Sequence, residues 1–182
     1  MSRVLRGDRE AYRELVLVYE PVIRRLALKY LRREEDAEDA VQEIFIKAYR
    51  SLGRFELNRR FLPWLYSVAL NHLKTVYRRT RRIGDREVAE ERAGDPSFAS
   101  DRPADDPEHA ALRRAAEEEL RAAVDRLPPS LRDAVLLYYL QEASVDDVGE
   151  ALGLGRENVK SKLHRARKRL REILESTATD RD

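Results

Sequence analysis

Residues 144–174 read SVDDVGEALGLGRENVKSKLHRARKRLREIL, a stretch that predicts a short helix, a glycine turn and a longer helix. Ser144 and Asp147, three residues apart, form a capping-box pattern at the start of the first helix. Between Arg156 and Arg171 the second helix carries eight basic side chains and a single acid. Such a density of positive charge is unfavourable unless a polyanion is the partner. The stretch therefore predicts a helix-turn-helix that binds DNA.

The outer face of that basic helix supplies the candidate contacts with duplex DNA. A helix-turn-helix is positioned by phosphate contacts and reads base edges with a few residues near the start of its second helix. Arg165 is the strongest candidate for a base contact, because its guanidinium fork matches the N7 and O6 acceptors of guanine. His164 fits a contact and a simple solvent-facing position equally well. The candidate base-reading residues are Lys160, Ser161, His164 and Arg165, and the candidate phosphate contacts are Lys162, Arg167, Lys168 and Arg169.

A segment at residues 83–107 divides the chain into two regions of different charge. It is acidic, contains three of the seven prolines, and has too few large apolar residues to fold alone. Residues 1–82 carry 19 basic and 11 acidic side chains, whereas residues 83–125 carry 6 basic and 13 acidic ones. We therefore expect an all-α chain of two small helical domains, at 1–82 and 108–182, joined by an acidic flexible linker at 83–107.

Both regions show helical periodicity and lack the period-2 pattern of strands. In the first region we expect a helix over residues 8–31 that Pro21 kinks or divides, then helices from Asp36 and from Pro63. In the second region one helix is expected to end at Pro128 and another to follow it. Their inward-facing residues are expected to be Leu112, Ala116, Leu120, Ala123 and Leu127 in the first, and Leu131, Ala134, Val135, Tyr138 and Tyr139 in the second.

The helix from Asp36 combines an apolar stripe with a polar opposite face. The apolar residues run at helical spacing from Ala37 to Leu52. The other face carries Glu38, Asp39, Gln42 and Glu43. On pattern alone this face is interpreted as solvated, with acids favourably placed in the first helical turn. A binding surface is the alternative.

Aromatic and basic residues gather in the loop at 53–61 and in the helix that follows it. Phe55 and Phe61 supply rings in the loop, Trp64, Tyr66 and Tyr77 supply rings in the helix, and Lys74 and Arg78 supply positive charge. Single-stranded nucleic acid binds such surfaces by stacking its bases on the rings and placing its phosphates along the cations. The alternative is that the aromatic residues belong to the core and that the basic residues only increase solubility.

Several classes of function find no support in the sequence. The chain has no cysteine, which excludes disulfides, thiolate metal sites and cysteine nucleophiles, and its three histidines lack metal-ligand spacing. No phosphate-binding glycine loop or nucleophile elbow occurs. No apolar run approaches the roughly 18 residues of a membrane span, and the first residues lack a signal-peptide core. We therefore expect a cytoplasmic protein that is not an enzyme, is not inserted in a membrane, and binds no metal or cofactor.

Three stretches, in this order, resemble the extracytoplasmic-function (ECF) sigma factors, small two-domain sigma subunits of bacterial RNA polymerase. Residues 36–50, DAEDAVQEIFIKAYR, are similar to the region 2 helix that docks on the polymerase clamp. Residues 61–71, FLPWLYSVALN, are similar to the promoter-melting segment, and residues 127–170 are similar to region 4. The resemblance covers about residues 5–82 and 108–174.

The resemblance implies an alternative sigma factor that directs core RNA polymerase to specific promoters and assists promoter melting. It implies core polymerase and promoter DNA as partners, together with an anti-sigma factor. The implied polymerase-binding residues are Asp36, Glu38, Asp39, Gln42 and Glu43. Those implied for the −10 element, held as single-stranded DNA with a flipped base, are Phe55, Asn58, Arg59, Arg60, Phe61, Trp64, Asn71, Lys74 and Arg78. Those implied for the −35 element are Arg156, Lys160, Ser161, His164, Arg165 and Lys168.

The sequence departs from the family pattern within the helix-turn-helix. Glu157 and Asn158 stand where the family usually has Gly-Thr, and Val148 and Gly149 stand where it usually has Ile-Ala. Glu157 suits a helix N-terminus but would repel a nearby phosphate. The alternative functions are a free-standing helix-turn-helix regulator that binds duplex DNA without polymerase, and a helical adaptor that binds only protein.

Overall fold

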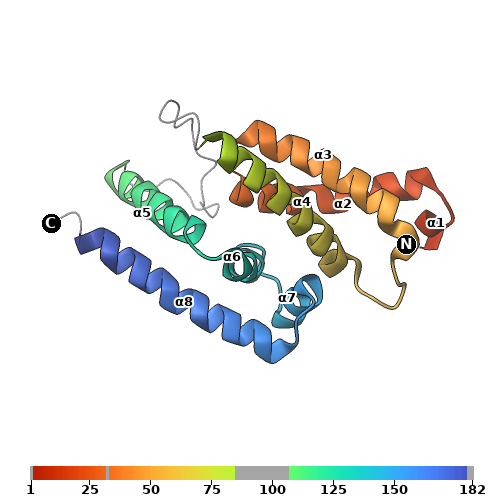
Figure 1. The fold of residues 1–182 in the computed structure, drawn as a ribbon. Helices are drawn as coiled ribbons and strands as arrows, with labels where there is room; N and C mark the ends of the chain where they lie inside the picture. The colour runs from red at the N-terminus through yellow and green to blue at the C-terminus, as the bar shows by residue number, and fades with distance from the viewer. Residues whose placement is uncertain (1, 32, 85–106, 180–182) are drawn as a thin grey trace.

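The computed structural model describes residues 2–31, 33–84 and 107–179, and every regular element within these ranges is helical (Figure 1). The predicted all-α fold is therefore confirmed. Most of the predicted linker, residues 85–106, lies outside the described residues. Its two ends are helical, because residues 83 and 84 continue α4 (Phe61–Gly84) and Pro107 begins α5 (Pro107–Asp125).

The N-terminal domain packs α2 (Arg9–Tyr30), α3 (Glu34–Ser51) and α4 around an apolar core. The short helices α1 (Ser2–Leu5) and η1 (Leu52–Arg54) lie at its edge (Figure 1). Each long helix turns its predicted apolar stripe inward, so that Ile23, Ile44 and Leu65 are fully buried. The apolar periodicity of the sequence is thus sufficient to orient all three helices.

Pro21 lies inside α2 without dividing it. We expected a kink or a break there, because proline lacks a backbone N–H and its ring crowds the preceding turn. The expected division into two helices is wrong. Core contacts on both sides of the proline, made by Ala11 and by Ile23, Leu26 and Ala27, keep one continuous helix against α3 and α4.

The C-terminal domain consists of α5, α6 (Pro129–Val135), the π-helical turn η2 (Leu136–Leu140), α7 (Val145–Leu152) and α8 (Arg156–Thr179). The helices α7 and α8 confirm the predicted helix-turn-helix. The Ser144 hydroxyl accepts from the backbone N–H of Asp147, and the Asp147 carboxylate accepts from the backbone N–H of Ser144, which completes the capping box. Gly153 ends α7 with a left-handed φ of 66°, a conformation that glycine adopts without strain.

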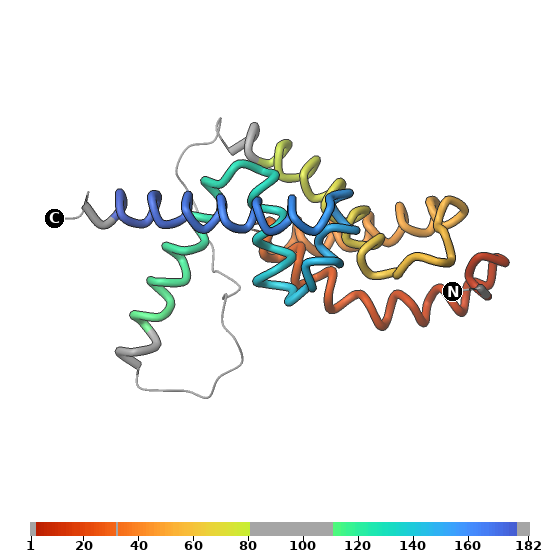
Figure 2. The backbone as a smooth tube through the Cα atoms, turned by 90° about the horizontal axis from the view of Figure 1, so that it is seen from below, coloured from red at the N-terminus to blue at the C-terminus, as the bar shows by residue number. Residues whose placement is uncertain are grey.

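Up to Leu120, α5 does not pack as predicted. Leu112 is 64% exposed and Leu120 is 40% exposed, and Ala116 between them is exposed as well. Figure 2 shows that α5 diverges from α8 toward its own N-terminus, so only its final turn reaches the core. Tyr139, also expected inside, is 45% exposed. Periodicity determines which residues share a helix face, but not whether another element covers that face.

The two domains are docked against each other. α7 lies against α4, and η2 lies against α2. Buried side chains of both domains form one continuous hydrophobic cluster, to which Tyr30 and Tyr66 contribute from one side and Leu136 and Leu137 from the other. No sequence pattern predicted this docking, and it brings α7 close to the loop at residues 55–60.

Candidate nucleic-acid interface

The residues predicted to bind duplex DNA lie along one side of α8. Val159, Leu163 and Ala166 are buried on the opposite side and fix the rotation of the helix. The six predicted residues, Arg156, Lys160, Ser161, His164, Arg165 and Lys168, are all exposed. A helix with one buried stripe and a basic outer face has the form that the major groove accepts.

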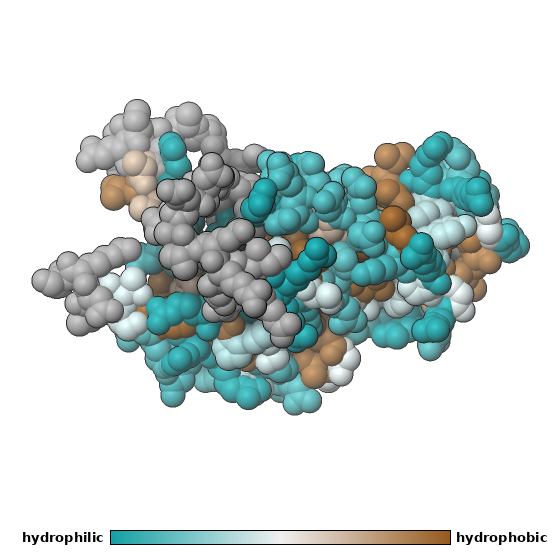
Figure 3. Space-filling model, turned by 45° about the horizontal axis from the view of Figure 1, so that its top comes forward, coloured by the Kyte–Doolittle hydropathy of each residue, from teal (hydrophilic) through white to brown (hydrophobic). Residues whose placement is uncertain are grey.

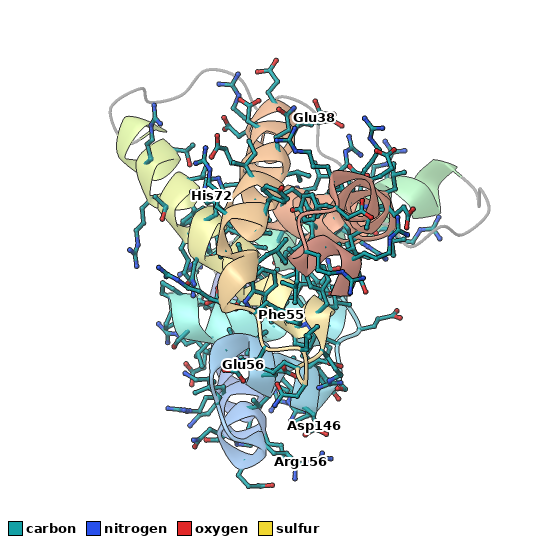
Figure 4. The ribbon with its side chains drawn as sticks, turned by 90° about the vertical axis from the view of Figure 1, so that its right-hand side faces the viewer. Glu38, Phe55, Glu56, His72, Asp146 and Arg156 are labelled. Carbon is teal, nitrogen blue, oxygen red and sulfur yellow. The ribbon has the colours of Figure 1, made fainter. Side chains whose placement is uncertain are left out.

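Two of these cations are paired with acids of the same domain. The Arg156 guanidinium donates to both carboxylate oxygens of Asp146, at 2.9 and 2.8 Å. The Lys160 ammonium donates to Glu157 at 2.7 Å and lowers the pKa of that carboxyl. Figure 4 shows Asp146 and Arg156 together at the far end of the C-terminal domain. Because both pairs are exposed, a phosphate can replace either acid at little cost.

The acidic face of α3 lies at the opposite end of the molecule, where Figure 4 shows Glu38. Glu38, Asp39, Gln42 and Glu43 are exposed, and Asp36 is half-buried. Arg24 of α2 donates to Glu34 at 2.7 Å and to Glu38 at 3.1 Å. Part of the negative charge is therefore compensated within the domain, and Asp39 and Glu43 carry the exposed charge of the next helical turn.

His72 joins α3 to α4 beside this face. Its Nδ1 lies 2.5 Å from the Lys47 ammonium. Burial and the charge of Lys47 lower the pKa of His72, whereas Glu43 opposes this shift. An ammonium group can only donate, so Nδ1 of His72 accepts a hydrogen bond from Lys47, and this contact links α4 to α3.

The aromatic residues predicted to bind single-stranded DNA pack against one another. The ring centroids of Phe55 lie 5.8 Å from Phe61 and 5.2 Å from Trp64, and those of Phe61 and Trp64 lie 5.4 Å apart. Phe55 is only 8% exposed, whereas Phe61 and Trp64 are half-buried. Phe55 is thus a core residue. Tyr66 of α4 is only 2% exposed, as the core alternative held for the helix aromatics, whereas Phe61 and Trp64 keep partly exposed rings.

The polar residues of the same surface fall into two groups. Asn58, Asn71 and Arg78 are exposed. Arg59 and Arg60 instead reach across to α7 of the C-terminal domain. Arg59 lies 3.2 Å from Glu150, and Arg60 lies 2.6 Å from Asp147 and 3.3 Å from Glu150. Figure 4 shows this loop, marked by Phe55 and Glu56, between the N-terminal helices and the helix-turn-helix.

Lys74, the remaining predicted residue, also contacts the C-terminal domain. Its ammonium lies 2.7 Å from the Asp133 carboxylate, a side chain that is only 3% exposed. The Tyr30 hydroxyl donates to the other oxygen of Asp133 at 3.1 Å. Burial, followed by the charge of Asp133, raises the pKa of Tyr30 to about 12.

The neighbouring Arg132 is enclosed by the N-terminal domain. Its guanidinium carbon lies 4.3 Å from the centroid of the Tyr30 ring and 3.9 Å from that of the Tyr77 ring, distances typical of cation–π contacts. Arg121 of α5 donates to the carbonyl oxygens of Leu28 and Leu31, at 3.3 and 3.4 Å, at the end of α2. A cation at a helix C-terminus is favourable, because the carbonyl groups there have no helical partner.

Sequence analysis missed this buried polar cluster of Tyr30, Lys74, Tyr77, Arg132 and Asp133. The available signal was the adjacent Arg132–Asp133 pair between Leu131 and Ala134, in a helix whose neighbours are otherwise apolar. Charged residues are rarely buried without a partner. Such a pair within an apolar run indicates partners from another element, although it does not indicate which.

Other kinds of site find no support in the described part of the chain. Among those residues, no group of histidine, aspartate and glutamate side chains could hold a metal ion. None of the helices described is both long enough and apolar enough to cross a membrane. On the face that Figure 3 shows, the described surface is mostly hydrophilic, with hydrophobic side chains in small separate patches.

Comparison with known proteins gives matches over both domains. Residues 15–83 match the family description Sigma-70 region 2, and residues 117–170 match Sigma-70 region 4. The chain is 35% identical to the RNA polymerase sigma-H factor of Pseudomonas aeruginosa, over 96% of this chain and 92% of the relative. It is 32% identical to the ECF RNA polymerase sigma factor SigW of Bacillus subtilis, over 96% of this chain and 94% of the relative.

Two solved structures share the fold. One is CnrH in complex with the cytosolic domain of CnrY, with a TM-score of 0.68 and 22% identity over 96% of this chain and 94% of that one. The other is the sigma factor RpoE in complex with the anti-sigma factor NepR from Bartonella quintana, with a TM-score of 0.65 and 24% identity over 91% and 98%. At these identities the likeness concerns the fold alone.

Proposed function

The chain belongs to the ECF sigma factors of bacterial RNA polymerase, and we propose that three of its surfaces bind core polymerase, −10 DNA and −35 DNA. As an alternative sigma factor, it directs core polymerase to specific promoters. The observation that carries the assignment is that the match extends over both domains and over nearly the full length of the relatives. We further propose that it acts in the cytoplasm as a non-enzymatic initiation factor and assists promoter melting.

The polymerase-binding surface is the exposed face of α3, formed by Asp36, Glu38, Asp39, Gln42 and Glu43. A row of carboxylates on a rigid helix suits a basic partner surface, because complementary charge accelerates association and excludes wrong partners. Arg24 neutralises part of this face through Glu34 and Glu38. Asp39 and Glu43 are therefore the residues whose charge we expect to matter most.

The −10 surface extends from the loop at 55–60 along α4. The partly exposed rings of Phe61 and Trp64 offer stacking to extruded bases, and Asn71 and Arg78 offer polar and charged contacts beyond them. Arg59, Arg60 and Lys74 supply positive charge for the phosphates once the C-terminal domain releases them. Phe55 supports the rings from inside the core and is a positioning residue.

The −35 surface is the exposed side of α8. Arg165 reads a guanine through its two-pronged guanidinium, and Lys160, Ser161 and His164 lie on the same side of the helix. Arg156 and Lys168 bind phosphates and set the position of the helix in the groove. An anti-sigma factor is a further proposed partner, because one of the solved structures with this fold contains an anti-sigma factor.

In vitro transcription tests this assignment directly. Core polymerase is assayed on a genomic fragment library with and without the protein, and we expect new specific start sites that depend on it. The double variant D39R/E43R should abolish these starts. The matched double variant E10R/E14R makes the same charge change on exposed positions of α2 and should retain them.

Two outcomes would overturn the proposal at different levels. If D39R/E43R supports transcription as well as E10R/E14R does, the α3 face does not bind polymerase. If no new starts occur and the protein does not co-elute with core polymerase, the free-standing regulator becomes the better hypothesis.

A further inference from the structure

We propose that α7 masks the −10 surface in the free protein, its carboxylates taking the places that DNA phosphates would occupy on Arg59 and Arg60. The inference rests on the proposed function of the loop at 55–60 as a DNA-binding surface. It assigns to α7 a second role, in which the first helix of the helix-turn-helix inhibits the other domain of the same chain.

The first observation is the pattern of charge at the α4–α7 contact. Arg60 lies 2.6 Å from Asp147 and 3.3 Å from Glu150, and Arg59 lies 3.2 Å from Glu150. The two acids lie one helical turn apart on the same side of α7 and present two carboxylates to two adjacent guanidinium groups. Arginine forks bind carboxylate and phosphate with the same geometry. A DNA strand and α7 therefore compete for the same donors.

The second observation is that the same docking engages a third cation of the DNA surface. Lys74 lies 2.7 Å from Asp133, which the Tyr30 hydroxyl also contacts. Arg132 lies between the rings of Tyr30 and Tyr77. Arg132 and Asp133 are each about 3% exposed, so this contact is desolvated, unlike a chance surface pairing.

The two contacts differ in how readily they open. The arginine–carboxylate pairs retain partial exposure, with Arg59 and Arg60 at 42% and 56%. Exposed pairs of this kind are weak and are screened by salt. The Asp133 cluster is buried between the two domains. When the domains separate, the charged groups of both domains must therefore be hydrated at the same time. We therefore expect the domains to separate as units and the α7 acids to tune how often they do so.

A conformational measurement tests the proposal without polymerase. The chain has no cysteine, so R50C on α3 and R167C on α8, both at exposed positions, accept a donor and an acceptor dye on the full-length chain. Variant D147N/E150Q removes both carboxylate charges and keeps the side-chain volumes. Variant D146N/E157Q makes the same charge change on the same domain, at acids that pair only with Arg156 and Lys160 in the described contacts.

We expect D147N/E150Q to increase the low-transfer population by about five-fold relative to D146N/E157Q, as the loss of three partly exposed ion pairs predicts. In the same buffer, D147N/E150Q should bind a random-sequence single-stranded DNA of about 20 nucleotides more tightly than E118Q/E142Q by a similar factor. That DNA-binding control makes the same charge change at exposed acids of the C-terminal domain that pair with no proposed DNA-binding cation in the described contacts. Raising the salt concentration should open the parent protein and reduce the difference between the two variants.

The outcomes separate the parts of the inference. Equal transfer in the two variants overturns the α7 contact. Opening without a gain in DNA affinity overturns the masking of the DNA surface. Neither readout depends on transcription. Failure of the sigma factor assignment would be seen only in assays with polymerase and is therefore distinguishable from failure of this proposal.

D147N/E150Q also alters the helix cap that Asp147 provides for α7, so a charge exchange that leaves Asp147 in place serves as a second test. E150R should open the protein. R59E/E150R should close it part of the way, because the pair at residues 59 and 150 is restored with reversed sign while Arg60 keeps only its contact with Asp147. If both variants show the same transfer, no specific pairing between α7 and the loop exists.

Discussion

Replacing Asp133 with asparagine should uncouple the two domains. The Asp133 side chain is 3% exposed and accepts from Lys74 at 2.7 Å and from Tyr30 at 3.1 Å. D133N keeps the shape of the side chain and removes the charge that compensates Lys74. The change therefore addresses the electrostatic part of the docking and leaves the surrounding apolar packing in place.

The magnitude follows from the burial of the two partners. Removing one member of a fully buried pair destabilises a protein by about 3–5 kcal/mol. Lys74 is 27% exposed and recovers part of its hydration when the carboxylate is gone, so we place the effect at the lower end, about 3 kcal/mol. The loss falls on the docked state, because both contacts of Asp133 cross from one domain to the other.

Urea unfolding followed by two probes measures this effect. Trp64 is the only tryptophan and reports on the N-terminal domain, whereas far-UV circular dichroism reports on the helices of both domains. One continuous core predicts coincident transitions for the parent. D133N should separate the two transitions and lower at least one midpoint. The exposed replacement D146N should leave them coincident.

Two results bear on the reasoning. Coincident transitions with an unchanged midpoint in D133N would refute the claim that this buried pair couples the domains. The double variant K74M/D133L should recover most of the lost stability, because an apolar pair of similar volume removes the desolvation penalty of both charges. A double variant that is less stable than D133N would contradict the electrostatic explanation.

Three further predictions concern alkaline stability, the turn geometry and base recognition. Burial, followed by the charge of Asp133, raises the pKa of Tyr30 from 10.0 to about 12, so the stability that this neutral hydroxyl contributes is complete below pH 10 and is lost as the pH rises toward 12. Urea midpoints across that range should fall less in Y30F than in the parent, and parallel curves would contradict this. A Cβ at Gly149 would lie 2.7 Å from the Leu154 carbonyl oxygen, so G149A should lower the free energy of unfolding by about 1–3 kcal/mol, measured by thermal unfolding. G155A serves as the control, because the space around Gly155 is open. An unchanged melting temperature in G149A would show that the turn adjusts freely. R165A should weaken binding to the promoter found by transcription mapping by about 1–3 kcal/mol and should relax the sequence preference at one base pair. A competition assay with promoter variants measures this preference. If R165A weakens binding to all promoter variants equally, Arg165 contacts phosphate instead.

The helix-turn-helix could be predicted from the sequence because each of its features is local. Ser144 and Asp147 are close enough along the chain to cap one helix, and Gly153 reverses the chain within one residue. The alternation of Val159, Leu163 and Ala166 with basic residues fixes which side of α8 is buried. None of these signals depends on another domain, so they predict the helix-turn-helix correctly regardless of how the rest of the chain packs.

The failures of prediction occur where a helix face needs a partner that the sequence does not specify. Leu112 and Leu120 share a face, as predicted, but α5 diverges before α8 can cover them. Pro21 was expected to interrupt a helix that tertiary packing keeps intact. Arg132 also pairs with the nearby Asp125, but the partners of Arg132 and Asp133 in the N-terminal domain lie about fifty or more residues away in the chain, beyond the range of any periodic pattern.

The −10 surface shows why the chemistry of a site was predictable when its present partner was not. The family resemblance implied Arg59, Arg60 and Lys74 as −10 residues, and cations beside aromatic rings suit phosphate and bases. In the free chain the same three cations meet carboxylates of the C-terminal domain. A guanidinium fork accepts either anion, so its presence indicates an anionic partner without naming it. The proposed masking implies that DNA must displace the acids of α7 and α6 from these three cations before it can bind.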